Sequence, residues 1–293
     1  MIRKGLLITL VGALAVSFLA SCDFDVVTDE EDRSLRMVYT DWSEGIALTY
    51  LSSMLLEEKM DYEVKLKLTD VESAYRELAE KEADVFADAW LPETQQRYYE
   101  KYADKLEQIG ITYPEARTGF VVPQYSSLKT VQDLKKYRYP IVGIDSGAGV
   151  MQKARLAITK YNLPSQLLHL SEGEMTAHLE DSIKRRKEVV VTGWEPHWIF
   201  ARYEVRFLED AEKIFGENEK IYTISRLGIE EDHPRVVRFF ERMQLSEKQL
   251  NSLVYYMRRN EDPIVGIREW IKKNEYVVNQ WVKDLGKERE KIM

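Results

Sequence analysis

Strand-like and helix-like stretches alternate along the chain from Leu35 onward, and this alternation limits the possible folds more than any other feature. A strand-like "LRMVYTDW" is followed by a helix-like "GIALTYLSSMLLEEKM" and a second strand-like "YEVKLKLT". Strands alternating with helices predict an α/β fold with mostly parallel sheets. About 255 ordered residues with two separate strand–helix–strand clusters predict two lobes. From His233 onward the chain has the pattern of helices.

A secretory signal peptide is predicted at the N-terminus. Arg3 and Lys4 precede an apolar stretch of about 15 residues, which is shorter than the ~20 residues that cross a bilayer as a helix. A positive start followed by a short apolar run is the layout of a secretory signal. We therefore assign residues 1–21 to a signal peptide.

Cys22 is the only cysteine of the chain, so no intramolecular disulfide is expected. It follows Leu19-Ala20-Ser21, and this stretch resembles a bacterial lipobox, in which the signal is removed and the cysteine is acylated. An ordinary signal with an incidental cysteine is the alternative. Residues 22–34 are acidic and are expected to form a flexible tether. The sequence thus predicts a protein on the extracytoplasmic (or periplasmic) face of a bacterial cell membrane, held by a lipid anchor.

The charge pattern argues against a nucleic-acid partner. The net charge is -8, and the short basic runs have acidic residues nearby. The four histidines lack metal-ligand spacing, and no G-x-S-x-G motif is present. No catalytic residue, metal or cofactor is therefore predicted, and His197 is interpreted as a hydrogen-bond donor that braces its loop. An exported hydrolase is kept as the alternative among enzymes.

Three tryptophans follow strand-like stretches, where ligands bind in open α/β sheets. Trp42 comes after "MVYTD", Trp90 after "DVFADA" and Trp194 after "VVVTG". One such residue alone would be interpreted as core. Three at equivalent positions, drawn from both halves of the chain, indicate a shared site. Trp198 is expected to pack under its loop, and Trp270 and Trp281 are expected in the core.

Indole faces carry negative electrostatic potential, so they attract cations. A quaternary ammonium suits them well, because its methyl groups donate no ordinary hydrogen bonds and favour apolar surface. In "IVGIDSGAGVM", Gly147 and Gly149 permit a tight turn before a helix whose first N–H groups can bind an anion. Taken alone, that stretch could equally be a structural turn.

Four motifs resemble the glycine betaine binding proteins of bacterial ABC importers, the OpuAC-like osmoprotectant receptors: "YTDWSEGIA", "DAWLPETQ", "VGIDSGAGVM" and "TGWEPHWIFARYEVRFLED". The resemblance covers most of the chain after residue 35. It implies the bilobal periplasmic-binding-protein fold (type II), with two α/β lobes joined by a two-crossing hinge and a ligand cleft between them. We expect residues 35–118 and 228–293 to form lobe 1, and residues 119–227 to form lobe 2.

The resemblance also implies a ligand site. Trp42, Trp90 and Trp194 would form the prism around the ammonium group, and the backbone N–H groups of Gly149 and Val150 would hold a carboxylate. Gln95 stands where the best-known members have a histidine that helps to bind the carboxylate. A neutral amide there is expected to bind this group without charge assistance and with little dependence on pH.

The implied partners are glycine betaine or a similar quaternary-ammonium ligand and an ABC permease in the cytoplasmic membrane, and a monomer is expected. A receptor of the same fold for choline or carnitine is the main alternative. Choline has no carboxylate, so Asp41 or Glu44 near Trp42 would then face its hydroxyl group or its charge.

Overall fold

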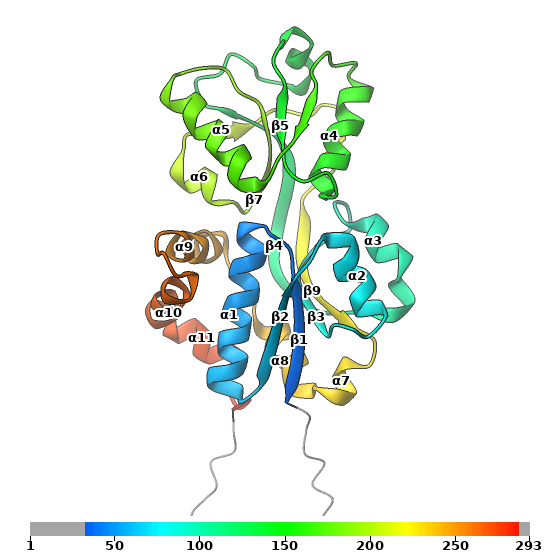
Figure 1. The fold of residues 1–293 in the computed structure, drawn as a ribbon, viewed down its shortest axis with the longest axis vertical. Helices are drawn as coiled ribbons and strands as arrows, with labels where there is room; N and C mark the ends of the chain where they lie inside the picture. Colours follow the sequence, from blue (N-terminus) through cyan, green and yellow to red (C-terminus); the bar gives the residue numbers. More distant parts are fainter. Residues whose placement is uncertain (1–32, 287–293) are drawn as a thin grey trace, which may run out of the picture. The chain divides into compact units, whose positions relative to one another are not determined.

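The computed structural model describes residues 33–286. The predicted signal peptide (1–21), Cys22 and nearly all of the predicted tether (22–34) lie outside the described residues. The described part folds as one compact unit, in which two sheets with their covering helices form two lobes (Figure 1). The bilobal α/β fold predicted from the sequence is confirmed.

The sheet of the first lobe has the strand order β2-β1-β3-β9-β4. Strand β1 pairs in parallel with β2 and β3, whereas β9 pairs antiparallel with β3 on one side and β4 on the other. The strands are β1 (Ser34–Tyr39), β2 (Glu63–Leu68), β3 (Val85–Leu91), β9 (Glu219–Arg226) and the first part of β4 (Leu106–Pro123). The helices are α1 (Ser43–Met60), α2 (Val71–Ala79), α3 (Gln96–Lys101), α7 (Ile229–Asp232), α8 (Pro234–Arg242), α9 (Glu247–Arg258), α10 (Pro263–Lys273) and α11 (Glu275–Trp281).

The sheet of the second lobe continues from the other end of β4, in the order β4-β7-β5-β6, with β8 paired to β4. Strands β5, β6 and β7 are parallel to one another, and β4 is antiparallel to β7 and β8. The strands are β5 (Ile141–Gly143), β6 (Leu167–His169), β7 (Val191–Glu195) and β8 (Val205–Phe207). The helices are α4 (Gly149–Lys160), α5 (Glu172–Lys184) and α6 (Trp198–Arg202), and two 3-10 turns lie at Ala103–Lys105 and Val131–Lys136.

Strand β4 is shared by the two sheets and forms one of the crossings between the lobes. It pairs with β9 as far as Ala116 and with β7 from Arg117 onward. The chain returns between β8 and β9, so residues 219–226 belong to the first sheet. The sequence alone predicts these residues in lobe 2, within 119–227. The prediction differs because the pairing partners of a strand are distant in sequence and leave no local signal.

The expectation of mostly parallel sheets is also wrong. The long strand β4 runs through both sheets, and all of its pairings are antiparallel. The alternation of strands and helices does correspond to parallel pairs, but only among β1, β2 and β3 and among β5, β6 and β7.

Local chemistry explains several element ends. Asp70 caps α2 by accepting from the Ser73 N–H, and Ser171 and Ser246 form reciprocal capping boxes at the starts of α5 and α9. Helix α1 is different, because its N-cap residue is Trp42, whose side chain makes no capping hydrogen bond.

The core agrees with two expectations. Trp270 and Trp281 are buried and stack at 6.4 Å between ring centroids, as predicted for the last helices. All seven residues of β3 are buried, which suits a strand flanked by β1 and β9 and contacted by α1 and α2.

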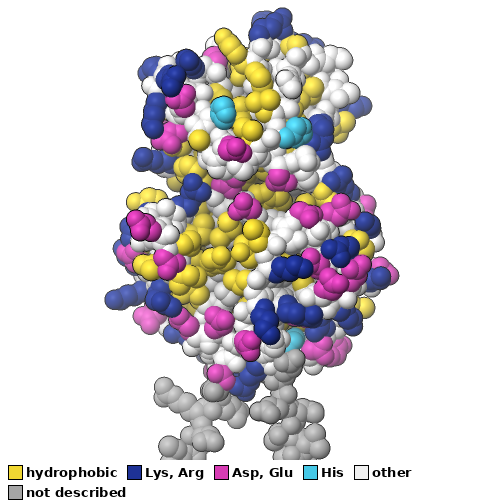
Figure 2. Space-filling model, in the orientation of Figure 1, with side chains coloured by type: hydrophobic (Ala, Val, Ile, Leu, Met, Phe, Trp, Pro, Cys, Tyr) yellow, Lys and Arg dark blue, Asp and Glu magenta, His cyan; other side chains and the backbone are white. Residues whose placement is uncertain are grey.

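The described surface carries mixed charge. Figure 2 shows basic and acidic side chains interspersed over the visible face, with no single basic stripe on it. Among residues 33–286, no helix combines the length and apolar character needed to cross a membrane.

Candidate functional site

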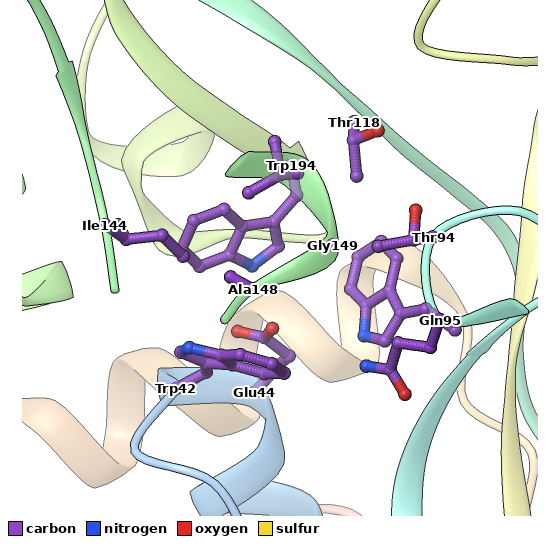
Figure 3. A pocket seen from close by; sticks show the side chains of 11 residues that line it. Trp42, Glu44, Thr94, Gln95, Thr118, Ile144, Ala148, Gly149 and Trp194 are labelled. Carbon is purple, nitrogen blue, oxygen red and sulfur yellow. The ribbon is translucent and has the colours of Figure 1, made fainter. Parts of the chain in front are cut away.

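Three indoles from three different elements line one pocket (Figure 3). Trp42 lies between β1 and α1, Trp90 is the penultimate residue of β3, and Trp194 is the penultimate residue of β7. All three are buried, with exposed fractions of 8%, 3% and 3%. The structure thus brings together side chains that are far apart in sequence, two from the first lobe and one from the second.

The pocket has about 290 Å³ of space free of protein atoms, its open mouth included. Its other walls come from both lobes and combine apolar groups with a few polar ones. The lining residues are Trp42, Glu44, Trp90, Thr94, Gln95, Thr118, Ile144, Ala148, Gly149, Val150 and Trp194. Thr94, Thr118, Ile144 and Ala148 were not identified from the sequence, which carries no signal for residues that only complete a wall.

Carboxylates fix the edges of two indoles. Trp42 Nε1 donates to Asp145 Oδ2 at 3.0 Å, a bond that joins the two lobes. Trp90 Nε1 donates to Asp88 Oδ1 at 2.8 Å within β3. Because each N–H is held at the ring edge, the ring orientation is set and the face is left for other contacts.

Trp194 is held differently. The ring of His197 packs edge-on against it, with 4.5 Å between centroids. Its buried Nε1 has no hydrogen-bond partner of standard geometry, and in Figure 3 the carboxylate of Glu44 lies between Trp194 and Trp42. His197 itself accepts from the Ile199 N–H through Nδ1 at 3.2 Å. It therefore braces the loop after β7, although for this bond it acts as acceptor rather than as the expected donor.

The start of α4 supplies unpaired donors. Gly149 and Val150 are its first two residues, and the N–H groups at such positions have no acceptor inside their helix. Ala148 N–H is taken by Asp145 Oδ1 at 3.1 Å. A Cβ on residue 149 would lie 2.0 Å from the carbonyl oxygen of Thr94, so only glycine permits this approach of the two lobes.

Gln95 lines the pocket beside Trp90 and is 1% exposed. Its Oε1 accepts from Tyr75 Oη at 2.9 Å, and its Nε2 donates to the Asp88 carbonyl at 3.3 Å. An amide nitrogen carries two hydrogens, so one donor is left after these bonds. The expected contact of Gln95 with a carboxylate thus rests on that second hydrogen.

Two buried carboxyl groups lie beside the indoles. Glu44 is 2% exposed, and burial, together with Asp88 and Glu172 nearby, raises the pKa of its carboxyl well above the usual range. Burial also raises the pKa of Asp88 to about 8, although the hydrogen bond from Trp90 lowers it. Within residues 33–286, Glu44 Oε2 and Asp88 Oδ2 have no hydrogen-bond partner of standard geometry.

Only part of this pair was predicted from the sequence. Asp88 was not singled out, although an acidic residue within the apolar strand "DVFADAW" is a signal that could have identified it. Glu44 was considered only for choline, together with Asp41, and the structure separates the two: Glu44 lines the pocket whereas Asp41 is exposed. Within residues 33–286, no group of histidine and acidic side chains is arranged to hold a metal ion.

Comparisons with known proteins agree with this geometry. Residues 33–273 match the family model of the substrate-binding domain of ABC-type glycine betaine transport systems, OpuAC. The structure is similar to that of lactococcal OpuAC in its closed, liganded conformation with glycine betaine. The match between the two has a TM-score of 0.82 and a sequence identity of 29%, and it covers 86% of this chain and 100% of that chain.

Two further proteins are similar to this chain. One is the glycine betaine/L-proline-binding protein ProX of Borrelia burgdorferi, at a TM-score of 0.79 and 30% identity, over 86% of this chain and 97% of that chain. The other is the glycine betaine/carnitine transport binding protein GbuC of Listeria monocytogenes, which is 32% identical over 169 residues. That match spans 57% of this chain and 56% of the length of GbuC.

Proposed function

The chain belongs to the OpuAC family of substrate-binding domains of ABC-type glycine betaine transport systems, and we propose that it captures glycine betaine, or a closely related quaternary-ammonium solute, and delivers it to an ABC permease. Because the family consists of binding domains and not enzymes, the alternative of an exported hydrolase is set aside. The relatives named for glycine betaine support this choice of ligand.

The observation that carries the proposal is the enclosure of one pocket by Trp42, Trp90 and Trp194. A trimethylammonium group between three indole faces gains cation–π attraction from each face. Its methyl groups also leave water for apolar surface. Lysine-like ammonium groups would gain less, because their N–H donors need acceptors that indole faces lack.

The carboxylate of the ligand is proposed to bind at the start of α4. The N–H groups of Gly149 and Val150 lie at the positive end of a helix of twelve residues, where an anion is stabilised. Gln95 is proposed as a neutral donor to the same carboxylate through its second amide hydrogen. This last contact is supported by the neighbouring Thr94, because its carbonyl lies against Gly149 and so brings Gln95 close to the start of α4.

Choline is the second candidate, and Glu44 is the observation that favours it. Glu44 lines the pocket with an unpartnered Oε2, so its ionised form could neutralise a ligand that carries only a positive charge. Choline would leave the N–H groups of Gly149 and Val150 without an anion. Carnitine retains a carboxylate, so it would use both the three indoles and the N–H groups at the start of α4.

Secretion through a signal peptide, lipid attachment at Cys22 and a monomeric state are also part of the proposal. Secretion and lipid attachment are supported by the sequence "LASC" after an apolar stretch. The test is fractionation of cells that express the full chain: the parent protein should label with palmitate and sediment with membranes, whereas Cys22→Ala should do neither. Size-exclusion chromatography with light scattering tests the monomer.

A competition titration tests the choice of ligand. Glycine betaine is titrated into the purified protein by calorimetry, alone and in the presence of excess choline or carnitine. The proposal predicts that betaine binds more tightly than choline. If choline binds as tightly as betaine, the carboxylate site is idle and a choline receptor is the better description. If no quaternary amine binds, the proposed function is wrong.

A further inference from the structure

We infer that Glu172 is a positioning residue that holds the two lobes together as a latch. It does not line the ligand pocket, but it thereby brings together Trp42, Trp90 and Trp194, which are called the indole cage below. The inference rests on the proposed function, because it assigns a role in closure around the ligand. Glu172 is the first residue of α5 in the second lobe, and its side chain is almost completely buried. Its partners come from both lobes.

On the first lobe, Glu172 caps a helix that cannot cap itself. Its Oε2 accepts from the Ser43 N–H at 2.7 Å, and its Oε1 accepts from the Ser43 hydroxyl. Ser43 is the first residue of α1, where the N-cap position is filled by Trp42. An indole cannot accept this hydrogen bond, so the capping carboxylate comes from the opposite lobe. The negative charge also suits the positive end of α1.

On its own lobe, Glu172 contacts two residues that follow the strand of Trp194. Trp198 Nε1 donates to Oε1 at 3.3 Å, and His197 Nε2 lies 3.2 Å from the same oxygen. His197 in turn packs against Trp194. One carboxylate therefore connects the residue next to Trp42 with the residues that support Trp194.

Arg258 of α9 completes the contact between the lobes. Its Nη1 donates to the Ser43 hydroxyl at 3.1 Å and lies 3.9 Å from Glu172 Oε1, and its guanidinium stacks 4.2 Å from the ring centroid of Trp198. Burial opposes ionisation of Glu172, but hydrogen bonds from His197 and Ser43 hold its pKa at about 2. The carboxylate is thus charged at any pH near neutrality.

Other contacts also join the lobes: Trp42 to Asp145, Tyr98 Oη to the Gly147 carbonyl at 2.8 Å, and Lys153 Nζ to Glu219 Oε1 at 3.7 Å. Among these contacts and that of Glu172, only the Glu172 contact satisfies a helix start and connects the neighbours of Trp42 with those of Trp194. When the lobes separate, the Ser43 N–H must exchange this carboxylate for water. The latch should therefore slow ligand release without touching the ligand.

The primary variant is Glu172→Ala, and Glu174→Ala is its matched control. Glu174 belongs to the same first turn of α5 and accepts only from Ser171, on the exposed side of the helix. Ser43→Pro removes the donor from the other lobe. Proline is favoured at the first helical position, and Trp42 before it already has the extended conformation that proline requires (φ -116°, ψ 141°).

The readouts are the dissociation rate of glycine betaine and the separation of the lobes. Spin labels at the exposed positions of Tyr139→Cys and Tyr276→Cys, in the full chain with Cys22→Ser, report the separation by double electron–electron resonance. We expect Glu172→Ala to speed dissociation by about 10-fold or more, as for loss of a hydrogen bond to a charged group. It should also shift the distances toward the separated state. Glu174→Ala should match the parent in both readouts.

If Glu172 and Ser43 form one latch, the double variant should release betaine hardly faster than Glu172→Ala alone, because both substitutions remove the same contact. A merely structural role would instead lower the melting temperature and leave the lobe distances of the folded protein unchanged. The inference is overturned if Glu172→Ala closes as fully as the parent and releases betaine within about twofold of its rate. If the parent binds no betaine, the proposed function fails. In that case the distances between the spin labels in the ligand-free protein test the latch by themselves. Equal distance distributions for the parent and Glu172→Ala would overturn it.

Discussion

At the scale of single residues, the pocket depends on groups that hold the indoles as much as on the indoles themselves. Asp145 and Asp88 accept the N–H groups of Trp42 and Trp90. A phenylalanine at either position would keep an aromatic face but leave the carboxylate without its donor. Asp88 is buried, and an unpaired buried acceptor is costly, so tryptophan at position 90 serves both needs. Asp145 is exposed, so water can replace the donor that Trp42 supplies to it.

Removal of any one cage indole should weaken betaine binding strongly. Trp42→Ala, Trp90→Ala and Trp194→Ala are each expected to cost about 2 kcal/mol, or roughly 30-fold in affinity, because a desolvated cation loses one aromatic face. Trp270→Ala is the control, since this buried residue lies in α10, away from the pocket. It should lower the melting temperature and leave the affinity of the folded fraction unchanged. Calorimetry at matched folded concentration distinguishes the two classes, and equal losses of affinity in both would contradict the assignment.

Glu44 should make choline binding depend on pH. Its raised pKa favours the protonated carboxyl, whereas a bound cation favours the ionised form, so binding of choline to the protonated protein releases a proton. Affinity for choline should therefore rise as the pH is raised through the range in which Glu44 titrates. Betaine carries its own carboxylate and should respond less. The buried Asp88 titrates nearby, with a pKa of about 8, while Glu172 stays ionised.

Glu44→Gln separates these contributions in the same titrations. The amide matches the size of the protonated acid but cannot ionise, so the rise in choline affinity should become smaller and betaine should bind within about threefold of the parent. A steep pH dependence for choline that survives in Glu44→Gln would assign the effect to Asp88. The flat pH profile expected from Gln95 alone therefore applies to betaine and not to choline.

At the scale of elements, the start of α4 is the point where a helix, a loop and the opposite lobe meet. Gly149→Ala would place a Cβ 2.0 Å from the Thr94 carbonyl oxygen, so the lobes could not approach and the N–H groups would be displaced. We expect betaine affinity to fall by about 10-fold or more. Gly147→Ala is the matched control, because the nearest atom to its Cβ would be 3.5 Å away. Similar losses in both variants would show that the loop, and not the close contact, is at issue.

The same element shows what the sequence could and could not predict. The glycines of "IVGIDSGAGVM" predicted a turn before a helix, and the structure starts α4 at Gly149. The strand ends likewise predicted that Trp42, Trp90 and Trp194 would lie together, and they line one pocket although β7 belongs to a different sheet from β1 and β3. The contacts of Glu172 were not predictable, and for Asp88 the only local signal was an acidic residue within an apolar strand. Their burial depends on elements that are distant in sequence, and a local pattern carries no record of that packing.

At the scale of the whole molecule, the two lobes contact each other on both sides of the pocket, through Ser43 and Glu172 and through Tyr98 and Gly147. We propose that the lobes comprise residues 33–116 with 219–286 and residues 117–215, which follows the change of partner within β4 and the return to β9. Both crossings then lie behind the pocket, where a hinge must be if the cage is to open. The sequence predicts boundaries near residues 118 and 227, and the second differs from the return proposed here, near residue 217, because the sequence does not show which strands pair with β9.

The central claim is that the cage recognises methylated ammonium, and a methyl series tests it most directly. Glycine betaine, dimethylglycine, sarcosine and glycine share one carboxylate and differ only in the number of methyl groups. Calorimetric titration of the purified protein with each should give affinities that fall at every step, because each lost methyl removes apolar contact and adds an N–H donor that the indoles cannot accept. Glycine should show no measurable binding. Equal affinities across the series, or tighter binding of glycine than of betaine, would contradict the account.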